Sequence, residues 1–185
     1  MGRWVGRAVV LTLLGPLAFG PAGRAWGIPF PGSAPPAVCS FELHDTATPG
    51  WTMTPSHGTA VAAGTMSCTG VVNGARLTGE PGPFRTRYLY DSAQVPGGNT
   101  CALAGGNGTW AVELPADRGP LRLTGTFTWE GTLAGTMTGD LGRLPVTLGY
   151  EAHPEPDHAD EECVTKAASH FGLLGQGTIG FLSAP

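Results

Sequence analysis

Apolar and polar residues alternate along several stretches of this chain, a pattern typical of half-buried β-strands. In the clearest stretch Phe84, Tyr88 and Tyr90 share one face, with arginines and a leucine between them. The same alternation recurs in four further stretches, at 109–114, 121–129, 132–139 and 144–150. In the third of these it places Leu133 and Met137 inward. No sustained helical period follows residue 26, so the pattern predicts strands throughout.

Turn-forming residues separate these stretches. Asn73-Gly74 gives the clearest signal, because both residues tolerate the positive φ that a two-residue hairpin needs. Weaker signals fall at 96–99, 105–108, 117–120, 130–131 and 140–142. About ten short strands at such spacing predict an all-β fold, an antiparallel sandwich or barrel. The pattern allows one short helix, at 160–169.

The first 25 residues have the order of a secretory signal peptide. Arg3 and Arg7 precede an apolar stretch at 8–19, and small residues follow it. This stretch is shorter than the about 20 residues that a membrane-spanning helix needs. We therefore expect cleavage after Ala22 or Ala25 and a secreted, extracellular protein.

The rest of the chain is expected to form one domain. Residues 26–37 include four prolines, which predict an extended arm, and residues 38–183 carry the strand pattern. Without residues 1–25 the chain has seven Lys+Arg and fourteen Asp+Glu, a net charge of −7. This acidity disfavours nucleic acid and anionic membranes as partners, and no later stretch is long and apolar enough to span a membrane.

The chain contains four cysteines, Cys39, Cys68, Cys101 and Cys163. In an exported protein an even number of cysteines indicates two disulfides. Three pairings are open, and we favour Cys39 with Cys68 and Cys101 with Cys163. The spacing contains no C-x-x-C pair, which argues against a thiolate metal site.

The stretches MSCTGVVNGARLTGE, TCALAGGNGTW and LRLTGTFTW resemble repeats of small, Gly/Thr-rich, four-cysteine secreted β-proteins of high-GC bacteria. The resemblance covers most of residues 38–182. That group has no assigned activity. The resemblance therefore implies a bacterial extracellular β-domain and no mechanism.

The densest group of polar side chains is EAHPEPDHADEEC, residues 151–163. His153, Asp157 and His158 could supply nitrogen and oxygen ligands to a divalent cation. Two prolines hold this segment extended, however, so the two histidines converge only if the chain turns at Asp157. We favour a solvated acidic loop between strands for this segment, with the cation site as the alternative. His44 and Asp45 are expected in a loop after the strand at 38–43.

The expected strand faces also suggest a binding surface. Six threonines lie on the outward positions of two neighbouring strands, at 124, 126, 128, 132, 136 and 138. A flat hydroxyl array can bind sugars or proteins, although threonine also simply suits exposed strand positions. Asn107-Gly108-Thr109 matches a glycosylation acceptor, and we interpret it as a hairpin turn.

The sequence contains no G-x-S-x-G, no G-x-G-x-x-G that opens an expected helix, and no phosphate-binding G-x-x-x-x-G-K. We therefore expect a secreted non-catalytic module without a cofactor, which binds an extracellular protein or glycan or has a structural role. Two alternatives stay open. One is a cation-dependent protein or enzyme that uses residues 151–162, and the other is a secreted protease inhibitor.

Overall fold

The computed structural model describes residues 35–90, 95, 99–159 and 163–180. Within these residues the chain forms eight strands and one short 3-10 helix, η1 (Pro156–His158). The strands are β1 (Ala37–Trp51), β2 (Gly58–Val72), β3 (Ala75–Tyr90), β4 (Gly105–Leu114), β5 (Leu121–Gly131), β6 (Ala134–Leu141), β7 (Leu144–Pro154) and β8 (Ala168–Ile179). The expected signal peptide, most of the expected arm and residues 181–183 lie outside the described residues.

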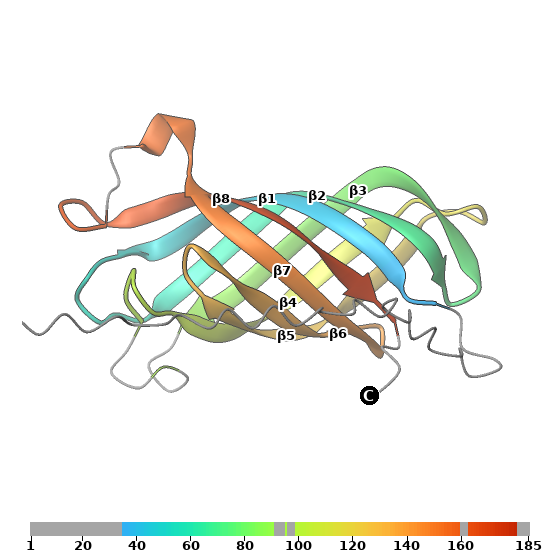
Figure 1. The fold of residues 1–185 in the computed structure, drawn as a ribbon, viewed down its shortest axis with the longest axis horizontal. Helices are drawn as coiled ribbons and strands as arrows, with labels where there is room; N and C mark the ends of the chain where they lie inside the picture. The colour runs from blue at the N-terminus through green and yellow to red at the C-terminus, as the bar shows by residue number, and fades with distance from the viewer. Residues whose placement is uncertain (1–34, 91–94, 96–98, 160–162, 181–185) are drawn as a thin grey trace, which may run out of the picture. The chain divides into compact units, whose positions relative to one another are not determined.

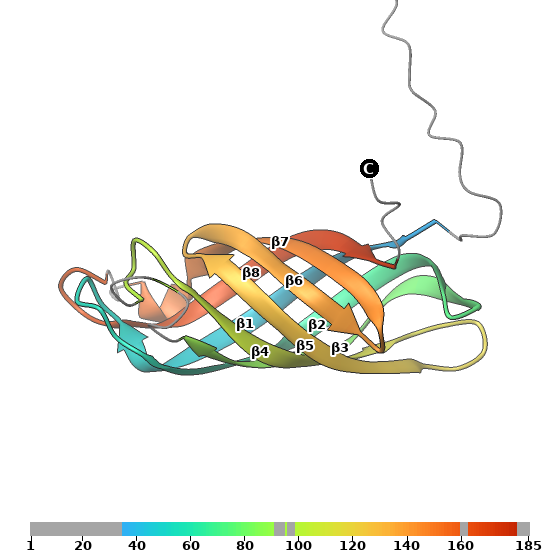
Figure 2. The same cartoon turned by 90° about the horizontal axis from the view of Figure 1, so that it is seen from below.

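The strands form a closed antiparallel barrel. Each strand pairs with the next one along the chain, and β8 pairs with β1 to complete the circle. Figures 1 and 2 show the strands running obliquely around this barrel. Closure gives each of the eight described strands a hydrogen-bonded neighbour on both sides. The all-β antiparallel prediction is confirmed, with a barrel rather than a sandwich.

The barrel has fewer strands than the about ten expected, because β1, β2 and β3 are 15 to 16 residues long. The turn expected at 105–108, which includes Asn107, is wrong because these residues begin β4. Glycine serves there as a point of close approach: a Cβ at Gly106 would lie 2.7 Å from Nε1 of Trp129. The helix expected at 160–169 is also absent from the described part of that range, where β8 begins at Ala168.

The alternation read from the sequence is confirmed as an inside–outside pattern. Phe84, Tyr88 and Tyr90 point into the barrel, and the arginines between them face outward. Met137 is buried as expected, but Leu133 is 68 % exposed. The inward assignment of Leu133 is wrong because this residue lies in the turn between β5 and β6, where the strand alternation is interrupted.

The two ends of the barrel differ. At one end short turns join the strands, and Asn73-Gly74 forms the predicted hairpin turn with φ values of 49° and 76°. At the other end, on the left in Figure 1, the long connections 91–104 and 155–167 follow β3 and β7. We call the first the turn end and the second the loop end.

The two disulfides are those that the sequence analysis favours. Cys39 and Cys68 face each other on β1 and β2, in register and buried. Cys101 and Cys163 join the two long connections at the loop end, with Cα atoms 6.3 Å apart. The second bridge therefore holds two distant parts of the chain together over one end of the barrel.

No helix in the described residues is long and apolar enough to cross a membrane.

Candidate functional site

Aromatic rings line the barrel interior toward the loop end. Trp51, near the end of β1, stacks on Trp129 of β5 with ring centroids 5.6 Å apart and planes 3° apart. Tyr88 meets Trp129 edge-on at 5.2 Å, and Phe171 of β8 lies 5.3 Å from Trp51. These side chains come from four strands that meet only because the barrel closes. They form the wall of a pocket at this end.

A carboxylate is buried in this wall. Asp45 is 2 % exposed, and its Oδ2 accepts a hydrogen bond from the hydroxyl of Tyr88. Its second oxygen, Oδ1, is buried and has no hydrogen-bond partner among the described residues. Buried polar atoms are nearly always paired, so an unpaired carboxylate oxygen is costly to the fold.

Burial also changes the protonation of this group. Desolvation raises the pKa of Asp45 from 3.8 to about 7, and the hydrogen bonds from Tyr88 and from the Thr46 backbone offset only part of that rise. The same desolvation raises the pKa of Tyr90 to about 12 and the pKa values of Tyr88 and Tyr150 further above the usual tyrosine range. The tyrosines therefore stay protonated, while Asp45 titrates near neutral pH.

The pocket at Asp45 has a cavity volume of about 20 Å³, enough for a group the size of one water molecule. Its deeper lining includes Phe127 and Met137, and Thr132, Ala152 and Phe171 lie where the strands end. The pocket thus has a mainly aromatic wall, a buried carboxylate and a rim at the loop end. Nε1 of Trp51 and Nε1 of Trp129 are also buried without a hydrogen-bond partner among the described residues. Apolar walls with few convergent polar groups are typical of small-molecule sites.

The long connections pack against the same end. The backbone N–H of Cys101 donates to Thr52 O at 3.1 Å, and Sγ of Cys163 lies 3.5 Å from Trp51 O. Asn99 is 1 % exposed, and its side-chain oxygen accepts from Gly105 N at 2.8 Å. The Cys101–Cys163 bridge therefore lies directly beside Trp51 in the pocket wall.

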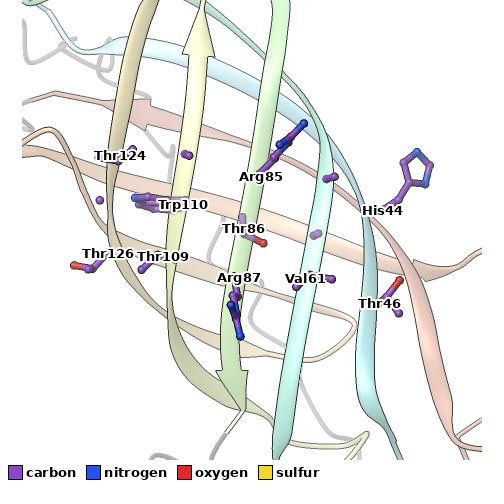
Figure 3. Close-up of a pocket in the computed structure, with 14 residues that line it drawn as sticks. His44, Thr46, Val61, Arg85, Thr86, Arg87, Thr109, Trp110, Thr124 and Thr126 are labelled. Atoms are coloured by element: carbon purple, nitrogen blue, oxygen red, sulfur yellow. The ribbon is translucent and has the colours of Figure 1, made fainter.

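A second concave region lies on the outside of the barrel, across β1 to β5 (Figure 3). It has a volume of about 780 Å³. Arg85 and Arg87 project from β3, the central strand of the region, and neither forms an ion pair with a described residue. Small residues flank them in register: Ala63 and Ala111 beside Arg85, and Val61 and Thr109 beside Arg87.

The outward threonines continue this region onto β5 and β6. Thr124, Thr126 and Thr128 are exposed on β5, and the hydroxyl of Thr128 lies 3.2 Å from that of Thr138 on β6. Thr132, expected on the same array, instead lies in a turn and lines the pocket at Asp45. The exposed threonines of β5 and β6 therefore form the expected hydroxyl array, but Thr132 is not part of it.

The metal-ligand candidates do not gather in the described residues. His153 lies at the end of β7, whereas Asp157 and His158 lie in η1. The ring of His158 stacks on His170 of β8, with centroids 3.7 Å apart. No group of three His, Cys, Asp or Glu in the described part of the chain is close enough to hold a metal ion.

The acidic segment contacts the barrel at Glu155. Nδ1 of His44 lies within hydrogen-bond distance of Oε1 of Glu155, at 2.6 Å. His44 is on the outer face of β1, so the contact fixes the start of the connection after β7. The expected loop at His44 and Asp45 is wrong, because both residues lie within β1.

Sequence reasoning overlooked Asp45, although the sequence carried a signal for it. Cys39, Phe41, Leu43, Asp45 and Ala47 are alternate residues, and all are buried. A charged residue at an inward position of such a pattern marks either the end of a strand or a buried charge. The sequence analysis places Asp45 in a loop after the strand, whereas the structure shows the buried charge.

Comparison with known proteins yields no match: no family model, no curated protein and no solved structure is similar to this chain.

Proposed function

We propose that this chain is a secreted, non-catalytic binding module that takes a small ligand into the loop end of its barrel. The observation that carries the proposal is the buried carboxylate of Asp45, with one oxygen unpaired in an aromatic pocket. A buried, unpaired carboxylate lowers the stability of a fold. Such destabilising groups are commonly found at binding sites.

Two further features support export and binding. Two disulfides are typical of proteins in oxidising compartments, which agrees with the expected signal peptide. The Cys101–Cys163 bridge ties down the connections beside the pocket, and this reduces the entropy lost when a ligand is bound there. The hydroxyl of Tyr88 is engaged with Asp45 and keeps its proton, so it serves as a donor rather than a nucleophile.

The test is a panel of small cationic, neutral and anionic compounds, followed by melting temperature and tryptophan fluorescence. We expect at least one class to raise the melting temperature and change the fluorescence saturably, because Trp51 and Trp129 line the pocket. Phe171→Ala should weaken that response. Leu174→Ala is the matched control, since Leu174 lies on the same strand but is 48 % exposed.

A saturable response that survives Phe171→Ala unchanged would place the ligand elsewhere. If no compound of any charge produced a response, the proposal of a binding module at this end would be wrong.

The outer face supports a second candidate, the binding of an extracellular glycan or protein with acidic groups. Two guanidinium groups without ion-pair partners among the described residues lie beside exposed threonines on one concave region. Guanidinium groups bind carboxylates and sulfates through paired N–H donors, and hydroxyls complement sugar groups. The overall acidity of the chain makes this arginine pair a local exception.

A glycan array tests this second candidate. We expect retention on acidic glycans, weakened by salt and lost in the Arg85→Ala, Arg87→Ala double variant. Arg122→Ala is the control, because the Arg122 guanidinium is paired with Glu113 at 2.9 Å. Equal retention of the double variant and the parent would rule out this surface.

A further inference from the structure

We infer that the ligand of the loop-end pocket carries a protonated amine, which enters the pocket and pairs with Oδ1 of Asp45. This inference rests on the proposed function and adds the chemical class of the ligand. It is carried by three features of the pocket: the unpaired acceptor, the aromatic side chains around it, and the charges that surround it.

The first feature is the missing donor. Oδ2 of Asp45 already accepts from Tyr88, whereas Oδ1 is buried and without a partner among the described residues. An ammonium group supplies N–H donors and a compensating positive charge together. Charge-assisted hydrogen bonds are the strong ones, and a water-poor site strengthens them further.

The second feature is the aromatic wall. The stacked pair Trp51 and Trp129, with Tyr88 and Phe171 against it, lines the same pocket as Asp45. These rings keep the surroundings of Asp45 poor in water, and aromatic rings also attract a cation within about 6 Å of the ring centre, tryptophan most strongly.

The third feature is the charge around the carboxylate. The charge of Asp45 acts on three tyrosines, Tyr88 and Tyr90 from β3 and Tyr150 from β7, and all three keep their protons because burial raises their pKa values. Glu130 acts on Tyr150 in the same direction. No lysine, arginine or histidine lines this pocket in the described residues. Asp45 is therefore the charge that a ligand would meet.

The size of the pocket limits how much of the ligand enters it. A cavity of about 20 Å³ holds one ammonium head, which is about the size of a water molecule, and not a whole organic molecule. The remainder of the ligand would pass Thr132, Ala152 and Phe171 at the rim. We therefore expect recognition of the head group, with an apolar or aromatic neighbour against Phe171.

The experiment titrates the purified protein, with both disulfides formed, with methylammonium and benzylammonium. Methanol and benzyl alcohol serve as neutral counterparts, and sodium chloride controls for ionic strength. The readouts are tryptophan fluorescence and the ¹³C signal of the Asp45 carboxyl group, assigned by its loss in Asp45→Asn. At pH 8 we expect saturable binding of the ammonium compounds, at least about tenfold tighter than that of the alcohols.

Two controls make the result specific. Asp45→Asn should abolish the preference for the ammonium compounds, and Glu42→Gln, on the outer face of the same strand, should retain it. Because Asp45 titrates near pH 7, binding should weaken about tenfold from pH 8 to pH 6, while both ammonium groups stay protonated.

The outcomes separate this inference from the proposed function. If the alcohols, or anionic compounds of the panel, bind as tightly as the ammonium compounds and depend on Phe171, the pocket binds ligands but the inferred class is wrong. If the ammonium compounds bind equally well to Asp45→Asn, the inferred pairing is wrong. If no compound of any charge binds, both the inference and the proposed function fail.

Discussion

Asp45 is the residue at which stability and binding oppose each other most directly. Its carboxyl group is buried among aromatic rings with one oxygen paired to Tyr88 and the other unpaired. Burial disfavours the charged form, so the folded protein holds a proton that the unfolded chain has already released. The free energy of unfolding should therefore fall as the pH rises between the unfolded pKa and the folded one, from about 4 to about 7.

This gives the first stability prediction. Asp45→Asn removes the titration, so the free energy of unfolding of the variant should rise relative to that of the parent by about 4 kcal/mol between pH 4 and pH 8. Urea unfolding at the two pH values measures the difference, with Glu42→Gln as the exposed control. A constant difference between Asp45→Asn and the parent would mean that Asp45 titrates normally.

At the scale of elements, each hairpin depends on the few residues that reverse the chain. Asn73-Gly74 joins β2 and β3 with positive φ at both positions, which glycine adopts freely and other residues adopt at a cost. Gly149 lies instead in the extended backbone of β7, and a Cβ there would meet no atom closer than 3.8 Å. The same substitution should therefore have opposite effects at the two positions.

Gly74→Ala should lower the free energy of unfolding by about 1 kcal/mol, because alanine is strained at φ 76°. Gly149→Ala should leave it unchanged or raise it by up to about 1 kcal/mol, because it restricts the unfolded chain without strain in the folded one. Denaturant midpoints of the two variants decide the matter. Similar losses at both sites would contradict this account of the turn.

The disulfides act on different elements. Cys39–Cys68 joins adjacent paired strands, whereas Cys101–Cys163 joins two long connections that are 62 residues apart in the sequence. Each bridge should stabilise the fold by roughly 2–4 kcal/mol, and the bridge that closes the longer loop should stabilise it more. The connections at the loop end also pack beside Trp51, so the second bridge should influence the pocket as well.

We expect the Cys101→Ala, Cys163→Ala double variant to lose stability and also to bind pocket ligands more weakly at a temperature where it is still folded. The Cys39→Ala, Cys68→Ala variant should lose stability with little change in affinity. Melting curves and fluorescence titrations on both variants test this. Equal losses of affinity in the two variants would show that the second bridge has no particular role at the pocket.

At the scale of the whole molecule, the barrel is one cooperative structure. Trp51, Trp110 and Trp129 belong to a single buried cluster to which all eight strands contribute, and the first strand pairs with the last. Local unfolding of one strand would expose two edges and part of this cluster. Small domains of this kind usually unfold in a single transition.

Tryptophan fluorescence and far-ultraviolet circular dichroism should therefore report the same denaturant midpoint. The first signal follows the packing around the indole rings, and the second follows the strands. A fluorescence change well below the midpoint of the dichroism change would show that the loop end opens separately from the rest of the barrel.

The sequence by itself determined the class of structure. Period-two alternation at Phe84, Tyr88 and Tyr90 follows from strand geometry, which sends successive side chains to opposite faces, and the Asn73-Gly74 turn follows from local backbone preferences. Both signals are local, so a linear reading recovers them. Gly106 lies within a strand, where neighbouring atoms leave no room for a Cβ. The local pattern wrongly predicted a turn there.

The tertiary structure alone decided what the strands enclose. The pocket residues come from segments far apart in the sequence, Asp45 and Trp51 from β1, Tyr88 from β3, Trp129 from β5 and Phe171 from β8, and they meet because β8 pairs with β1 and closes the barrel. Closure also decides that Asp45 is inside, where loss of water raises its pKa. Sequence spacing fixes neither strand order nor register over such distances, so the pocket became visible only in the folded chain.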